Sequence, residues 1–141
     1  MKYIVAPKLT KLLSLVIDIH CITIWPIVLC SSTPTEGDKQ HEEIHGHQWR
    51  EIFNTLGWIT LPTLLLLCLA LPVHIGLLLV SLQLVINWLA FPAIYGAFYI
   101  RNYLRTTGKN RAAEAYYDIP FELEAYAHTG PRPYMNWTNY M

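Results

Sequence analysis

The longest uncharged stretch of the chain restricts its fold more than any other feature. Residues 56–100 contain no Lys, Arg, Asp or Glu, and a few prolines and glycines interrupt the apolar residues. About 20 apolar residues suffice for one helix to cross a bilayer, so this 45-residue stretch is too long for a single span. It predicts a hairpin of two transmembrane helices, near residues 57–73 and 76–99.

The composition agrees with a membrane protein. The chain has 141 residues, enough for one domain over residues 1–141, and 53% of them are hydrophobic whereas 14% are charged. Soluble domains carry about 25% charged residues. The ten basic and ten acidic residues balance. There is thus no basic field that would attract nucleic acid, and the expected partner is the lipid bilayer.

The distribution of charge predicts the orientation of the hairpin. The turn near residues 71–76 carries no charge, whereas Arg101, Arg105, Lys109 and Arg111 follow the second span. Positive charges favour the cytoplasmic side. Both flanks of the hairpin, and hence the C-terminus, are therefore expected in the cytoplasm.

Residues 12–30 allow several interpretations. Their length suits a third span, but Asp18, His20 and Pro26 oppose easy insertion. Many β-branched residues make an extended or re-entrant segment equally compatible, and we favour the extended form. The three cysteines form no CxxC pair. We therefore expect reduced thiols, without a disulfide framework or a thiolate zinc site.

The segment HEEIH carries the chemistry of the chain. His41 and His45 are four residues apart, so on a helix both imidazoles project from one face and can hold one zinc ion. Glu42 lies beside that face, where it can act as general base on a water at the metal. Glu43 and His47 are expected to be solvated neighbours. We expect this helix over residues 39–54, with Asp38 as its N-cap.

A third metal ligand is expected in the C-terminal part. Residues 112–128 read as helical pieces interrupted at Pro120, which suits a first helical turn, and residues 129–141 form an aromatic, proline-rich tail. Glu122 and Glu124 both lie on the last of these pieces. The hairpin returns them to the side of the membrane that carries HEEIH.

These motifs resemble those of membrane gluzincin metallopeptidases, the class of the CAAX prenyl protease and the heat-shock membrane protease. That class has an HExxH helix, then membrane-spanning helices, then FExxAD, whose Glu binds zinc. Phe121, Glu122 and Ala125 match FExxA, so the resemblance implies a zincin-like fold with Glu122 as third ligand. Tyr126 replaces the Asp that supports the family's site.

A closer resemblance covers most of the chain. Small uncharacterised bacterial and phage membrane proteins share an ITLWPFIF-type segment, HExIHxxQ, an apolar hairpin and AYxxxPFExEAY, in this order. ITIWPIVL at 22–29, HEEIHGHQ at 41–48 and AYYDIPFELEAY at 115–126 match them. This resemblance implies a bacterial inner-membrane or phage-encoded protein, and an extended segment beside the HExxH helix that binds substrate backbone.

Two functions remain open at this stage. The first is a zinc-dependent membrane peptidase with His41, His45 and Glu122 as ligands and Glu42 as base, acting on peptides or proteins. The second is a non-catalytic membrane protein, or a subunit of a larger membrane assembly, that retains the fold. The fold class expected in both cases is a mainly α-helical membrane protein.

Overall fold

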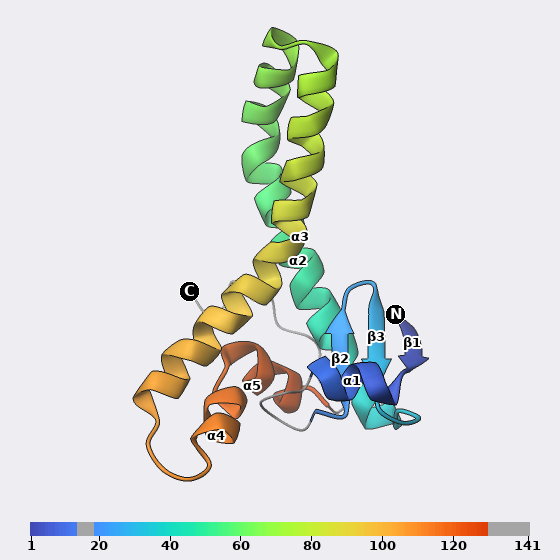
Figure 1. The fold of residues 1–141 in the computed structure, drawn as a ribbon, viewed down its shortest axis with the longest axis vertical. Coiled ribbons are helices and arrows are strands. Elements are labelled where there is room, and N and C mark those ends of the chain that lie inside the picture. Colours follow the sequence, from blue (N-terminus) through green and yellow to red (C-terminus); the bar gives the residue numbers. More distant parts are fainter. Residues whose placement is uncertain (14–18, 130–141) are drawn as a thin grey trace.

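The structure, a computed structural model, describes residues 1–13 and 19–129 and is mainly helical (Figure 1). The predicted tail beyond residue 129 lies outside the described residues, as do residues 14–18. The elements in chain order are β1 (Lys2–Val5), α1 (Pro7–Leu13), β2 (Cys21–Ile24), β3 (Ile27–Cys30), α2 (Glu36–Ala70), α3 (Val73–Arg105), α4 (Arg111–Tyr117) and α5 (Pro120–Ala127).

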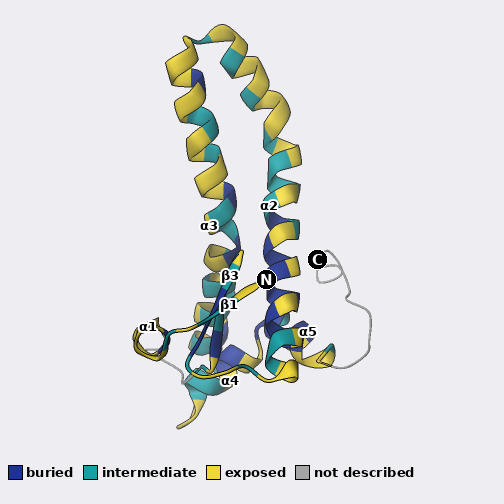
Figure 2. Ribbon diagram, turned by 90° about the vertical axis from the view of Figure 1, so that its right-hand side faces the viewer, coloured by how far each residue is buried: buried dark blue, intermediate teal, exposed yellow. Residues whose placement is uncertain are grey.

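The long helices α2 and α3 form the predicted hairpin. They run side by side away from the rest of the molecule, joined by a short turn at Leu71 and Pro72 (Figure 1). Only 6% and 11% of their most apolar 18-residue windows are buried, and Figure 2 shows exposed residues over most of this part. Both helices are long and apolar enough to cross a membrane. Their exposure distinguishes them from the core helices of a soluble protein.

Helix α2 is continuous, which corrects the predicted division into a helix over 39–54 and a span over 57–73. It runs without interruption through Gly57. This glycine faces the Asn87 side chain of α3, and a Cβ added to it would lie 3.7 Å from Nδ2 of Asn87. Pro62 also lies inside the helix. The HEEIH segment and the first span are therefore one rigid element.

The beginning of α2 also differs from the prediction. Thr35, not Asp38, is the N-cap: its hydroxyl accepts a hydrogen bond from the backbone N–H of Asp38. The Asp38 carboxylate accepts one from the backbone N–H of Thr35 in return. This reciprocal pair is a capping box, which stabilises a helix start more than a single cap does. At the other end of the hairpin, α3 exceeds the predicted 76–99 at both ends.

The extended form that we favoured for residues 12–30 holds for two short strands, β2 and β3, of a small sheet with the order β1-β3-β2. Residues 12 and 13 instead end the helix α1, and residues 14–18 lie outside the described residues. β2 pairs antiparallel with β3, and Cys21 lies opposite Cys30 in this register. These two cysteines form a disulfide, so the prediction of reduced thiols was wrong for them, whereas Cys68 is free. The spacing of the cysteines in the sequence did not predict this disulfide, because the bond depends on the β2–β3 hairpin that brings the two strands together.

The buried core lies where α2 and α3 separate, around α4 and α5. The buried residues of this core are Trp49, Ile52, Phe91, Tyr116, Ile119 and Phe121. Pro120 begins α5, as predicted, and Asn102 of α3 donates a hydrogen bond to the Ala115 carbonyl of α4. These contacts place α5 against the first half of α2 (Figure 1).

Candidate metal centre

The two histidines of HEEIH lie on one face of α2, as their spacing predicts. Both are buried, with 8% and 6% of their surfaces exposed. The Nε2 atoms of His41 and His45 lie 3.1 Å apart, and the ring centroids are separated by 4.7 Å. A separation of four residues turns a helix by about 40° from its starting direction, which brings the two imidazoles together.

Glu122 of α5 meets both histidines. One carboxylate oxygen lies 3.2 Å from Nε2 of His41, and the other lies 3.1 Å from Nε2 of His45. The ligand atoms of these three buried residues all lie within 4.8 Å of one another. Glu124 points elsewhere and accepts a hydrogen bond from Gln48. The structure therefore brings Glu122, not Glu124, to the histidines.

The three side chains could hold a metal ion. Bonds of about 2.0 Å at tetrahedral angles place neighbouring ligand atoms about 3.3 Å apart, close to the separations observed. The buried Oε2 atom of Glu122 lies 3.2 Å from Nε2 of His41, but no described residue donates a well-directed hydrogen bond to it. Two histidines and a glutamate form a ligand set known from catalytic zinc sites.

The electrostatics of Glu122 favour a cation beside it. Burial by itself would raise the pKa of this carboxyl, but the neighbouring His45 and His41 hold its pKa well below the ordinary value. The hydroxyl of Tyr95 contributes to the same shift. Glu122 in turn raises the pKa of His45 to about 9. The buried carboxylate is therefore paired with positive charge, which a protonated His45 supplies and a bound cation could supply in its place.

Two residues that the sequence did not single out support the ligands. Gln48 lies 2.8 Å from Nδ1 of His45, and the Tyr95 hydroxyl donates a hydrogen bond of 2.6 Å to Oε1 of Glu122. Such contacts orient metal ligands. Gln48 is part of the HExIHxxQ pattern and was therefore within reach of the sequence. Tyr95 comes from the apolar hairpin, where no local pattern distinguishes it.

Glu42 lies next to the metal group. Its carboxylate accepts a 2.7 Å hydrogen bond from the Thr23 hydroxyl of β2, and it lines the same cavity as His45 and Glu122. Glu43 and His47 are exposed, as predicted for solvated neighbours.

Tyr126 does not replace the family's Asp with another hydrogen bond to a ligand. Its ring packs against His41, with 4.5 Å between the centroids, and 48% of the residue is exposed. It covers one side of the imidazole. Gln48 and Tyr95, not Tyr126, are the residues that contact His45 and Glu122 through hydrogen-bonding groups.

Comparison with known proteins adds no family. No family model, no curated protein and no solved structure matches this chain. The resemblance to membrane gluzincins and to small phage and bacterial membrane proteins therefore stays a prediction from motifs, and the geometry of the site stands on its own.

Proposed function

We propose that this protein is a zinc-dependent, membrane-anchored peptidase of zincin-like fold. One observation supports this most: Glu122 meets His41 and His45 from a helix more than 70 residues away in sequence, and all three ligand atoms lie within 4.8 Å. A buried group of this kind, with a second glutamate beside it, has the composition of a hydrolytic zinc site.

The residues of the chain would divide the reaction between them. His41, His45 and Glu122 would hold zinc, which lowers the pKa of water and polarises a carbonyl group. Glu42 would take a proton from the attacking water at its carboxylate as the water oxygen bonds to the peptide carbon. The same carboxylate would return the proton to the amide nitrogen as the C–N bond breaks.

Strand β2 offers a place for the substrate backbone. It pairs with β3 along one edge, and within the described residues no strand occupies the other. β2 packs against α2, and its residues line the cavity that holds Glu42. A peptide that pairs with a free strand edge gains backbone hydrogen bonds. This arrangement would present its carbonyl groups to the metal.

The hairpin would anchor the site in a bilayer. Two features give opposing indications of its orientation. All ten Lys and Arg residues lie outside the uncharged stretch 56–100, on the side of the site, which favours the cytoplasm for the site. The Cys21–Cys30 disulfide is a bond typical of oxidising compartments. We propose the cytoplasmic orientation because it rests on charges along the whole chain.

Cysteine labelling tests this orientation. In a Cys68→Ser background, His74→Cys places a thiol in the hairpin turn, and Lys109→Cys places one beyond α3. A membrane-impermeant maleimide applied to intact cells should label the first and spare the second. Labelling of Lys109→Cys alone would reverse the orientation and put the disulfide in an oxidising compartment.

Metal content tests the proposed site. Purified in detergent, the wild type should hold about one zinc per chain, and His45→Ala and Glu122→Gln should lose it. Glu42→Gln should keep the zinc and cleave no peptide, whereas the adjacent, exposed Glu43→Gln should match the wild type in both assays. A wild type without zinc, or one that keeps it after His45→Ala, would refute the site.

The alternative is a metal-binding membrane protein without catalysis, for which Tyr126 is the relevant observation. Tyr126 packs on His41 and stands at the motif position where the membrane gluzincins have an Asp. If wild type and Glu42→Gln bind zinc equally and neither cleaves any peptide of a random library, this alternative holds.

A further inference from the structure

A cavity of about 460 Å³ adjoins the metal group, within the usual range for ligand sites. Glu42, His45 and Glu122 lie in its wall, and most of the remaining lining is apolar or aromatic. This apolar lining comes mostly from β2, α2 and α3 and includes Ile24, Trp49, Trp88, Phe91, Pro92 and Tyr95. A group that binds here contacts the candidate catalytic residues at one end and aromatic rings elsewhere.

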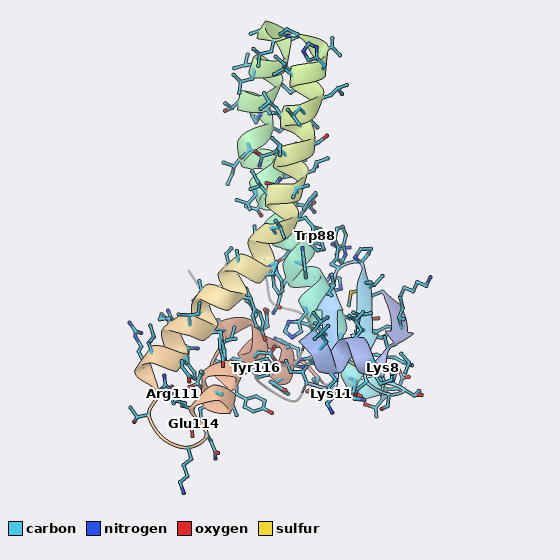
Figure 3. All side chains as sticks on the ribbon, viewed as in Figure 1. Lys8, Lys11, Trp88, Arg111, Glu114 and Tyr116 are labelled. Carbon is cyan, nitrogen blue, oxygen red and sulfur yellow. A yellow bond between two sulfur atoms is a disulfide. The ribbon has the colours of Figure 1, made fainter. Side chains whose placement is uncertain are left out.

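The cavity lies at the level where the apolar hairpin ends. Counting about 20 residues of α3 from its start at Val73, the length that crosses a bilayer, leads to Pro92. Trp88 lies where the two long helices separate (Figure 3), and Trp is favoured at membrane surfaces. Pro92 is exposed. The cavity is therefore next to the bilayer surface and not far out in water.

On the basis of the proposed function, we propose that this cavity binds a bulky apolar side chain, next to the scissile bond, of a bilayer-anchored peptide. A peptide paired with β2 directs alternate side chains to one side. If a carbonyl group of this peptide lies at the candidate metal centre, a neighbouring side chain lies in the cavity. The reason is that Glu42 and His45 belong to the candidate centre and also line the cavity. A charged side chain would lose hydration against these rings.

The tryptophans hold the cavity wall in place. The indole N–H of Trp49 donates to the Trp88 carbonyl, and the indole N–H of Trp88 donates to the Trp25 carbonyl at the end of the β2–β3 hairpin. The Trp49 ring stacks on Phe91, with 5.0 Å between the centroids. These contacts connect the substrate strand to the hairpin, so the shape of the cavity is fixed by the fold.

Gly96 offers a way to fill the cavity without disturbing this wall. It lines the cavity, and a Cβ built on it would meet no atom within 4 Å. Gly96→Leu therefore introduces a side chain into open space and also improves helix propensity. Ala97→Leu is the matched control, because Ala97 is exposed, adjacent on α3 and outside the lining.

A binding assay tests the cavity apart from catalysis. The probe is a synthetic peptide with one membrane anchor and 4-bromophenylalanine just outside it, titrated against zinc-free protein in phosphatidylcholine–phosphatidylglycerol nanodiscs. Bromine near Trp49 and Trp88 should quench tryptophan fluorescence. The peptide with alanine at that position should bind at least tenfold more weakly. Gly96→Leu should weaken binding of the bromophenylalanine peptide at least tenfold, and Ala97→Leu should leave it unchanged.

A second assay uses the zinc-loaded protein with the same peptides and follows cleavage. Cleavage beside Phe, Leu or Trp and not beside Ala or Asp supports the proposal. Cleavage without this preference, or equal binding by Gly96→Leu and wild type, overturns the cavity while the peptidase stands. Selective binding without any cleavage overturns the peptidase and keeps the cavity. Equal binding of a peptide without an anchor overturns the role of the bilayer.

Discussion

The Oε1 atom of Gln48 lies 2.8 Å from Nδ1 of His45, and this contact determines which nitrogen of the imidazole carries the proton. The Gln48 amide nitrogen donates to the Phe121 carbonyl at 3.1 Å and to the Glu124 carboxylate at 2.8 Å. Both are acceptors, so the amide oxygen must face His45 and accept from Nδ1–H. In the neutral ring, Nε2 then has its lone pair free for a metal.

We therefore predict that Gln48→Leu weakens zinc binding by about 10- to 100-fold, the usual effect of removing a residue that orients a ligand. Gln48→Glu should preserve zinc binding better than Gln48→Leu does, because its carboxylate can still accept a hydrogen bond from His45, although it lies against the Glu124 carboxylate. Competition with a fluorescent chelator measures both constants. The control is His47→Ala, an exposed neighbour on α2. Unchanged zinc affinity in Gln48→Leu would remove Gln48 from the site.

Tyr95→Phe should destabilise the zinc-free protein. The Tyr95 hydroxyl donates a 2.6 Å hydrogen bond to the Glu122 carboxylate, and hydrogen bonds to charged groups contribute about 1.5–3 kcal/mol. The free energy of unfolding in detergent should fall by about that amount. Tyr99→Phe, one turn further along α3, is the matched control. Its buried hydroxyl has no hydrogen-bond partner among the described residues, so this change should be neutral. Equal effects of both changes would argue against the contact.

The Cys21–Cys30 disulfide changes the number of reactive thiols that is expected from the sequence alone. A maleimide should modify one thiol per chain in the native protein, Cys68, and three after reduction and unfolding. Replacing Cys21 and Cys30 with Ser opens a loop of about ten residues, which should lower the free energy of unfolding by about 2–3 kcal/mol. Modification of all three thiols without reductant, in protein kept from oxidation during purification, would contradict the bond.

The hairpin and the two histidines of the candidate metal centre could be predicted because both depend on strong patterns. The absence of charged residues from 56 to 100 by itself predicts apolar helices long enough to span a membrane. The spacing of His41 and His45 puts them on one face of any helix. Glu122 was harder, since its approach depends on how α5 packs against α2, and the choice over Glu124 came from a family resemblance. The structure supports that choice by placing Glu122 between the two histidines.

The missed features depend on contacts between distant segments. The capping box was visible in the letters TEGD, but Asp38 is also a good N-cap, and its role as partner of Thr35 depends on where the helix begins. Strand pairing decides that Cys21 meets Cys30. Tyr95 reaches Glu122 only because α3 packs against α5 in the core. Periodicity in one segment cannot reveal such pairs.

Thr23→Val should impair cleavage while leaving zinc in place. The Thr23 hydroxyl donates a 2.7 Å hydrogen bond to Oε2 of Glu42, and it also reaches the Glu42 backbone carbonyl at 3.3 Å. It therefore holds the carboxylate of the proposed base in a fixed position relative to the metal group. Val has nearly the same shape and cannot donate, so β2 should keep its place while the carboxylate loses its partner.

The expected result is a fall in kcat of roughly 10-fold or more, a part of the roughly 100- to 10,000-fold that a positioned base contributes, with about one zinc per chain retained. Thr23→Ser keeps the donor and should restore most of the activity, which a purely structural role of the methyl group would not do. Thr60→Val serves as a control away from the site, because its hydroxyl bonds only to backbone carbonyls of α2. If Thr23→Val cleaves as fast as the wild type, then Glu42 needs no support from β2, and the strand acts on the substrate alone.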